Sequence, residues 1–116
     1  MDERLEKALD FSNYMLTLSN QKRLLAEKYQ EDLLYFYNGS QFTITRELIT
    51  FVGTMVNSDQ DEIVITDDNN LPCLVEDTDS FYNEIIDKYT TASNEYYSEY
   101  LKLKKSRSIE KLVNYE

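Results

Sequence analysis

The sequence contains no histidine and no tryptophan, and it has only two glycines and one cysteine. Without histidine, the chain lacks the usual general base near neutral pH and the commonest metal ligand, so nucleophile–histidine catalysis is excluded. Gly39 and Gly53 cannot build a glycine-rich loop for a phosphate group. Cys73 is the single cysteine of the chain, so an internal disulfide is excluded. Its place in the apolar run LPCLV is typical of a buried thiol. We therefore expect no enzymatic activity, no cofactor and no metal site.

Proline is scarce as well, and long apolar runs are missing. With 2 Gly and 1 Pro among 116 residues, the composition favours long regular elements over loops. No run of about 18 apolar residues could span a membrane, and no apolar segment typical of a signal peptide follows the charged start MDERLEK. The length suits a single domain over residues 1–116. We expect a soluble, unsecreted protein without a membrane partner.

The longest helical pattern covers residues 78–105, a tyrosine-rich stretch that Asp77 or Thr78 is expected to cap. A break at 106–108 is predicted before a short helix over 108–113. Apolar residues recur along one side of the long helix: Phe81, Ile85, Tyr89, Ala92, Tyr96 and Leu103. Because such a side needs a partner, a second long helix should pack against it in antiparallel orientation.

Residues 2–37 are predicted to form that second helix, with Asn38-Gly39 interpreted as its C-terminal stop. One apolar stripe follows spacings close to a heptad: Phe11, Met15, Leu18, Leu25, Tyr29, Leu33 and Phe36. A second stripe lies to its side: Leu5, Leu9, Leu16 and Leu34. A single neighbouring helix needs only one stripe, so the second stripe predicts a homo-oligomer with Leu16 and Leu34 in the interface.

The segment between the long helices is predicted to contain a strand, a short helix and a hairpin. Residues 41–44 alternate polar and apolar side chains, and Thr45 is expected to cap a buried helix over 46–57. Two β-prone runs within 62–75 flank the turn sequence DDNN, which predicts a hairpin. Because Pro72 cannot donate a ladder bond, it should lie on an edge strand or face outward from the pairing. The predicted fold class is α+β and mainly helical, with two long antiparallel helices. A small head would contain the short helix and an antiparallel sheet of two or three strands.

Charge is distributed unevenly along the chain. Residues 59–87 hold ten acids and no base, whereas 1–58 have a net charge of −2 and 88–116 of +2. Phosphate binding needs a broad basic face, so direct nucleic-acid binding is disfavoured. An acidic patch is predicted from Asp59, Asp61, Glu62, Asp67 and Asp68. Its clusters do not fit an EF-hand loop, which needs alternating ligands and a central glycine. A basic patch is predicted from Lys102, Lys104, Lys105 and Arg107.

Ten tyrosines are present, and many fall on the predicted long helices. One interpretation is that they fill the interface between these helices, because tyrosine offers a large apolar face with a hydroxyl that can stay hydrated. Another is an aromatic contact surface for a protein partner. Both interpretations can hold together, since a helix of this length cannot bury every tyrosine against one neighbour. Tyr97 and Tyr100 are the candidate partner-binding residues.

Three segments, MDERLEKALDFSNY, FYNEIIDKY and NEYYSEYLKLKKSRSIEKLV, resemble small coil-containing proteins of marine and cyanobacterial T-even-type tailed phages. The resemblance runs from end to end and includes the hairpin with its Asp-Asn turn. It implies a viral protein made in the cytoplasm of an infected bacterium, with a place in the virion as the alternative. It supplies no catalytic residues, and it favours an interaction protein over a metabolic enzyme.

Two functional hypotheses follow from these features. The first is a noncatalytic interaction or assembly protein that binds a phage or host protein through its helical, tyrosine-rich faces. The second is an acidic inhibitor that imitates nucleic-acid charge towards a host enzyme through residues 59–87. A DNA mimic should present carboxylates along an extended surface at phosphate spacing, whereas these acids cluster around turns and one helix start. The sequence therefore favours the first hypothesis.

Overall fold

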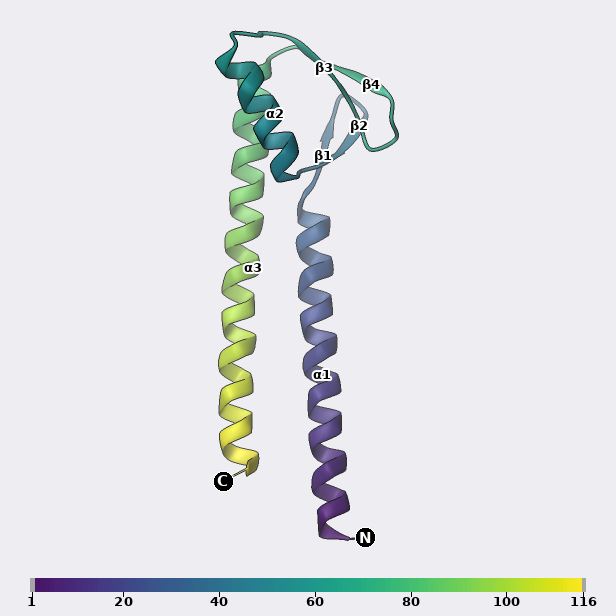
Figure 1. Cartoon of the computed structure of the whole chain (residues 1–116), viewed down its shortest axis with the longest axis vertical. Helices are drawn as coiled ribbons and strands as arrows, with labels where there is room; N and C mark the ends of the chain where they lie inside the picture. Colours follow the sequence, from purple (N-terminus) through teal and green to yellow (C-terminus); the bar gives the residue numbers. More distant parts are fainter. Residues whose placement is uncertain (1, 116) are drawn as a thin grey trace. The chain divides into compact units, whose positions relative to one another are not determined.

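The computed structural model describes residues 2–115, with side chains described for residues 2–106. The elements follow in the order α1 (Glu3–Asp32), β1 (Leu34–Tyr37), β2 (Ser40–Thr43), α2 (Arg46–Asn57), β3 (Ile63–Thr66), β4 (Pro72–Val75) and α3 (Thr78–Tyr115), as Figure 1 shows. Over this described part, two long helices, one short helix and two small antiparallel sheets make a mainly helical α+β fold, as predicted. Within the same range, no helix is long and apolar enough to cross a membrane.

The chain divides into two compact units. The helix-pair unit contains Met1–Tyr29 and Glu95–Glu116, and the hairpin unit contains Gln30–Asn94. Within the helix-pair unit, the α1 and α3 segments run side by side in opposite directions (Figure 1). By sequence, the hairpin unit holds 13 acids and 2 bases, a net charge of −11, and the helix-pair unit holds 9 acids and 10 bases, a net charge of +1. The acidity of the protein therefore belongs entirely to the hairpin unit.

The first helix ends earlier than predicted, because the residues expected to form its last turn are a strand. α1 ends at Asp32, and the predicted helix over residues 33–37 is wrong. Asn38 and Gly39 have positive φ angles of 47° and 81°, as a type I′ turn requires at both central positions. They close a two-residue hairpin between β1 and β2. The aromatic run of β1 fits a pleated strand better than a helix, so pairing with β2 decides the local structure.

The structure has two separate hairpins where the sequence predicted one sheet of two or three strands. β1 pairs with β2, and β3 pairs with β4. The turn residue Asp68 lies against β2, where its amide donates to the Gln41 carbonyl at 2.9 Å. Its carboxylate accepts the Thr43 amide at 3.0 Å and the Thr43 hydroxyl at 2.7 Å. Asp68 thus occupies the Gln41 carbonyl and the Thr43 amide, which are the β2 groups that a third strand would pair with. β2 therefore contacts the β3–β4 turn instead of pairing with β3, and the two sheets stay separate.

The predicted hairpin over 62–75 is confirmed, and its turn is organised by Asp67. This side chain is buried at 7% exposure, and its Oδ1 accepts the amides of Asn69 at 2.9 Å and Leu71 at 3.0 Å. The Asp67 amide donates in turn to the Leu71 carbonyl at 2.8 Å. Pro72 comes directly after this bonded pair, so the alternation of an antiparallel ladder places it at a non-hydrogen-bonded position. A proline is tolerated there on an edge strand, as predicted.

Both ends of α2 are capped. Thr45 Oγ1 accepts the Leu48 amide at 3.0 Å, so the predicted N-cap is confirmed. At the other end, Asp59 has a φ of 59°, and the Gln60 amide donates to the Met55 carbonyl at 3.0 Å. These features match a Schellman motif, in which a left-handed residue lets the chain turn back over the last helical carbonyls.

α2 lies at the surface, which contradicts the predicted buried helix. Val52 alone is buried among its residues, and Phe51 is 44% exposed. Gly53 explains how the helix packs, since a Cβ at this position would lie 3.0 Å from Cε1 of Tyr82 on α3. The missing side chain therefore lets α2 approach α3 within the hairpin unit.

Asp77 caps the start of α3, because its Oδ1 accepts the Ser80 amide at 3.1 Å. Phe81 in its first turns is buried at 1% exposure, and three rings meet it edge-on: Tyr35, Tyr37 and Phe42. These contacts form the centre of the hairpin unit's core. α3 then continues to Tyr115, so the predicted break at 106–108 and the separate short helix over 108–113 are wrong. Serine and arginine have adequate helix propensity, and no glycine or proline interrupts this stretch.

Candidate interaction surfaces

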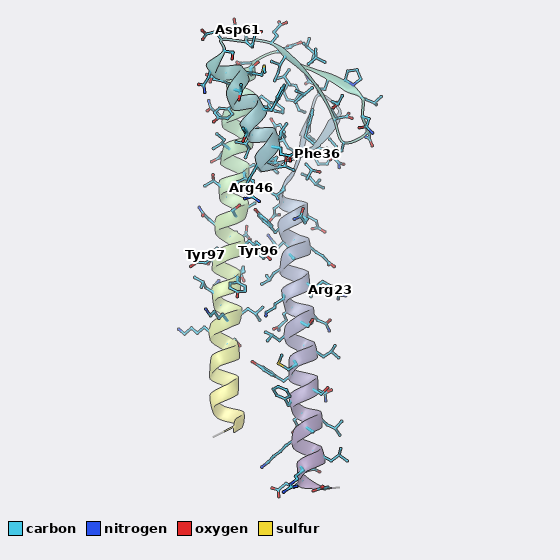
Figure 2. All side chains as sticks on the ribbon, viewed as in Figure 1. Arg23, Phe36, Arg46, Asp61, Tyr96 and Tyr97 are labelled. Atoms are coloured by element: carbon cyan, nitrogen blue, oxygen red, sulfur yellow. The ribbon has the colours of Figure 1, made fainter. Side chains whose placement is uncertain are left out.

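The helix-pair unit buries little of its apolar surface. Among its described side chains, Leu18 alone is buried, at 4% exposure. The rings of Tyr29 and Tyr96 stack across the pair with centroids 4.6 Å apart, and Lys28 Nζ lies 2.9 Å from Glu95 Oε1. Figure 2 shows Tyr96 between the two helical segments. One tyrosine pair thus lies in the interface between the helices, in agreement with the first interpretation of the tyrosines.

α1 carries a second apolar face that points away from α3. We call Leu5, Leu9 and Leu16 the outer stripe; their exposures are 51%, 47% and 63%. Leu9 and the buried Leu18 are nine residues apart, which places them about 180° apart on a helix with 100° per residue. Arg23 lies seven residues after Leu16 and therefore on the same face, and Figure 2 shows it projecting away from α3. The outer stripe has no described neighbour in the helix-pair unit that buries it.

α3 has an outward apolar face of its own. We call Tyr97, Tyr100 and Leu101 the tyrosine face; they are 64%, 41% and 43% exposed. In Figure 2, Tyr97 points away from α1, whereas the adjacent Tyr96 points towards it. The two long helices therefore each present large apolar side chains to solvent, on opposite sides of the helix-pair unit.

The structure separates the residues predicted to bind partners. Leu16, Tyr97 and Tyr100 lie on exposed helical faces of the helix-pair unit. Leu34 does not continue the outer stripe, because it lies half-buried in β1 of the hairpin unit. Its assignment to a helical interface is wrong, and the reason is the early end of α1 at Asp32.

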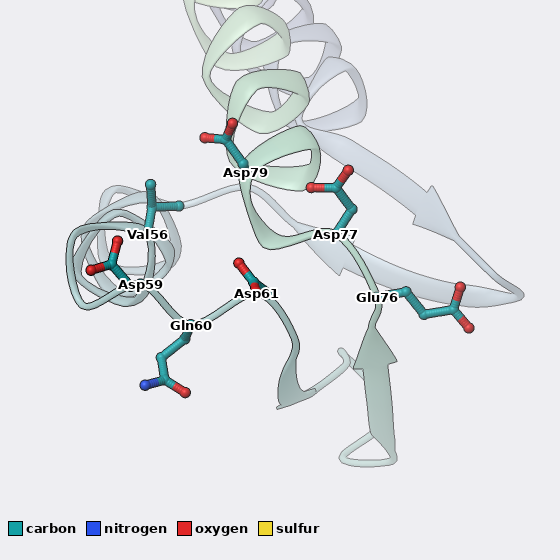
Figure 3. A pocket seen from close by; sticks show the side chains of 7 residues that line it. All are labelled: Val56, Asp59, Gln60, Asp61, Glu76, Asp77 and Asp79. Carbon is teal, nitrogen blue, oxygen red and sulfur yellow. The ribbon is translucent and has the colours of Figure 1, made fainter.

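The acidic surface of the hairpin unit centres on a depression of about 540 Å³ (Figure 3). Five carboxylates line it: Asp59, Asp61, Glu76, Asp77 and Asp79. Figure 3 shows Asp61 directed into the space between Asp59 and Asp77, while Glu76 extends outward. Among the residues whose side chains are described, no lysine or arginine lines the depression, so its field favours cations and basic side chains.

The predicted acidic patch is only partly brought together. Asp59 and Asp61 line the depression, whereas Asp67 and Asp68 are engaged in backbone and side-chain hydrogen bonds of the turn and of β2. Glu62 is exposed, but it does not line the depression. The predicted patch omitted three lining acids: Glu76, Asp77 and Asp79. The capping role expected for Asp77 was the available signal, because it places the start of α3 beside the end of the hairpin.

Burial and hydrogen bonding act in opposite directions on the pKa of Asp68. Burial raises the pKa of this group, but hydrogen bonds from the Thr43 hydroxyl, the Gln41 amide and the Thr43 backbone amide together outweigh burial. The pKa of Asp68 is therefore lowered from its ordinary value. Hydrogen bonds that favour the charged form tie this acid to β2 rather than to a ligand.

The described residues form no metal-binding cluster, and the predicted basic patch is only partly described. Within that part of the chain, no group of three or more acidic or cysteine side chains is arranged to hold a metal ion. Cys73 is buried, with Sγ 3.8 Å from the Leu74 carbonyl oxygen. In the predicted basic patch, Lys102 lies 3.1 Å from Glu99, while the side chain of Arg107 falls outside the described range.

A shallow apolar hollow in the hairpin unit was not expected from the sequence. Phe51 and Leu48 of α2 line it together with Val64 of β3. Phe51 and Val64 are 44% and 64% exposed. The alternation of buried and exposed residues in β3 could have indicated Val64, but the short distance to α2 depends on tertiary packing.

Comparison of the chain with protein-family models, with curated proteins and with solved structures gave no match. The function proposed below therefore rests on the surfaces of the two units.

Proposed function

We propose that this protein is a noncatalytic phage interaction or assembly module that binds a phage or host protein through the tyrosine face of α3. The observation that carries the proposal is that the helix-pair unit leaves more large apolar side chains exposed than it buries. Its described part buries one side chain, Leu18, yet leaves Tyr97, Tyr100 and Leu101 at least 41% exposed. The resemblance of the terminal segments to phage proteins supports the phage setting and a bacterial cytoplasm or a virion as the location.

Tyrosine at this surface suits binding better than folding. Tyr97 points away from α1, so its ring gives α1 no packing energy, while a partner could bury both its apolar face and its hydroxyl (Figure 2). Full burial of a large apolar side chain is worth about 1.5–3 kcal/mol, and tyrosine is enriched among residues that dominate binding energy. Two such rings on neighbouring turns form a compact anchor for a helical or grooved partner.

The test is affinity capture from infected host cells with the wild-type chain and two variant sets. The first set carries Tyr97→Ala and Tyr100→Ala, and we expect it to weaken capture of the main partner by about 2 kcal/mol or more, roughly thirtyfold. The second set neutralises the depression through Asp59→Asn, Asp61→Asn, Glu76→Gln and Asp79→Asn. We expect the second set to change mainly the association rate, and retention of the partner by the tyrosine variant would contradict the proposal.

A second candidate, an acidic inhibitor of a host enzyme, is favoured by the charge of the hairpin unit. Its net charge is −11, and five carboxylates meet around one depression. Binding of this kind should weaken steeply with salt and should be lost in the second variant set alone. Two acids of the predicted patch, Asp67 and Asp68, are already engaged within the fold, which leaves fewer charges for imitation.

A further inference from the structure

We propose that a second copy of this chain covers the outer stripe, with α1 of one copy packed in antiparallel orientation on α1 of the other. The inference rests on the proposed role of the helix-pair unit in binding, but it assigns a different face from the tyrosine face. The two assignments can fail separately, because one concerns α1 and the other α3.

The outer stripe has the spacing of a helix–helix seam. One face of α1 carries residues at alternating intervals of four and three: Leu5, Leu9, Ser12, Leu16, Ser19 and Arg23. This is the heptad spacing at which two helices pack along their length. The serines between the leucines are small, so a second helix can approach closely and place its own leucines opposite them. At 1.5 Å per residue, the seam is about 27 Å long.

Charge complementarity selects a second α1 as the occupant and gives its direction. Residues 2–10 hold four acids and two bases, and residues 11–21 hold no charge. Residues 22–28 hold three bases and one acid; one of these bases, Lys28, is engaged with Glu95 of α3, so Lys22 and Arg23 supply the positive charge available to a second copy. In an antiparallel pair, the acidic end of each helix faces the basic end of the other, and the uncharged middles meet. A parallel pair would bring like charges together at both ends. α1 is therefore complementary to itself in one direction only.

The distribution of charge between the units points to the same occupant. The hairpin unit, at −11, would repel its counterpart, whereas the helix-pair unit, at +1, can meet a second copy without that cost. The chain enters the hairpin unit between Tyr29 and Gln30 and leaves it between Asn94 and Glu95, both at one end of the helix pair. Antiparallel packing of two α1 helices therefore connects the two acidic units to opposite ends of the seam.

Sedimentation equilibrium of the full chain tests the seam. We expect a dimer at tens of micromolar and at least a hundredfold weaker self-association for Leu16→Asp, because a symmetric interface contains each substitution twice. Leu24→Asp is the matched control. Leu24 is also an exposed leucine of α1, at 55%, but it lies about 80° away from Leu16 around the helix. Circular dichroism checks that both variants keep their helices.

Cysteine cross-linking tests the direction in a Cys73→Ala background. A mixture of Leu9→Cys chains with Ser19→Cys chains should form disulfide-linked dimers more efficiently than either variant alone, because an antiparallel seam with leucines opposite serines brings residue 9 of one copy next to residue 19 of the other. A parallel pair would link each variant to itself. A monomeric wild-type chain, equal effects of Leu16→Asp and Leu24→Asp, or self-linking of each cysteine variant would each overturn the proposal. Loss of dimers in Leu16→Asp with retained partner capture would separate this seam from the tyrosine face.

Discussion

Asp68 joins two hairpins that share no strand pairing. Its amide and carboxylate form hydrogen bonds to Gln41 and Thr43 at distances between 2.7 and 3.0 Å. These bonds link the second hairpin to β2, as backbone pairing with a third strand would. A carboxylate can accept several hydrogen bonds at once, and the turn places this one next to the donors of Gln41 and Thr43 in β2. The acid is thus part of the architecture of the hairpin unit, although its charge suggested a binding role.

We predict that Asp68→Asn lowers the free energy of unfolding by about 1 kcal/mol at pH 7, a modest value because the site is exposed. The folded pKa lies below the unfolded pKa, so the contribution of Asp68 is present above the unfolded value near 3.9 and is lost as pH falls through the folded value. Urea unfolding at pH 7 and at pH 3 or below should show the difference between wild type and variant shrinking with acid. Glu62→Gln removes a nearby exposed charge as control, and an equal loss in that variant would show a general charge effect.

At the scale of elements, the contact between α2 and α3 depends on a missing side chain. Gly53 costs α2 about 1 kcal/mol of helix propensity relative to alanine. An added Cβ would lie 3.0 Å from the Tyr82 ring, so the packing of two elements outweighs the preference of one.

We predict that Gly53→Ala destabilises the protein by about 1–2 kcal/mol, because the Tyr82 ring must move. In a Tyr82→Ala background, the same substitution should stabilise by up to about 1 kcal/mol, since only the propensity gain remains. A double-mutant cycle from urea unfolding measures both values. The same sign in both backgrounds would mean that the ring yields without cost.

The elements also show how far the sequence alone could lead. Periodicity predicted both long helices, and capping chemistry predicted Thr45 and the start of α3, because these signals depend on neighbours within one or two turns. The end of α1 was missed although Asn38-Gly39 is a strong hairpin signal, since the residues before it also have acceptable helix propensity. The separation of the sheets depends on Asp68 and β2, which lie 25 or more residues apart, and local patterns cannot show such a contact.

The candidate surfaces were predictable to a similar degree. Leu16, Tyr97 and Tyr100 stand out in the sequence because helical spacing places them off the apolar face that pairs α1 with α3. The acidic depression needed the fold, because Asp59 and Asp61 meet Asp77 and Asp79 only when the hairpin brings the end of α2 to the start of α3. The pattern of charge alone could not show that Asp67 and Asp68 would accept hydrogen bonds within the hairpin unit.

At the scale of the whole molecule, the excess negative charge lies in one unit, and the exposed apolar faces of the long helices lie in the other. The hairpin unit carries −11 and the helix-pair unit +1, so self-repulsion acts within residues 30–94. Such repulsion destabilises a compact unit and is screened by salt, with a Debye length of about 10 Å at 0.1 M.

We therefore predict that the thermal midpoint rises by a few degrees between about 0.01 and 0.5 M NaCl, because screening relieves this repulsion. Calcium or magnesium chloride at equal ionic strength should raise it by the same amount, since the effect requires ions but no specific site. Scanning calorimetry measures the midpoint, and isothermal titration gives an independent check. A saturable calcium affinity in the micromolar range that disappears in Asp61→Asn would contradict this prediction and establish a metal site at the depression.

Tyr96 and Tyr97 are consecutive residues whose rings point to opposite sides of α3 (Figure 2). Tyr96 stacks on Tyr29, so selection for a folded protein acts on it directly. Tyr97 gives the fold little, so selection reaches it through whatever the outward face touches. Over evolutionary time, the two neighbours should therefore change at different rates and for different reasons. A lineage that exchanged one binding partner for another would record the exchange at Tyr97 and leave Tyr96 unchanged.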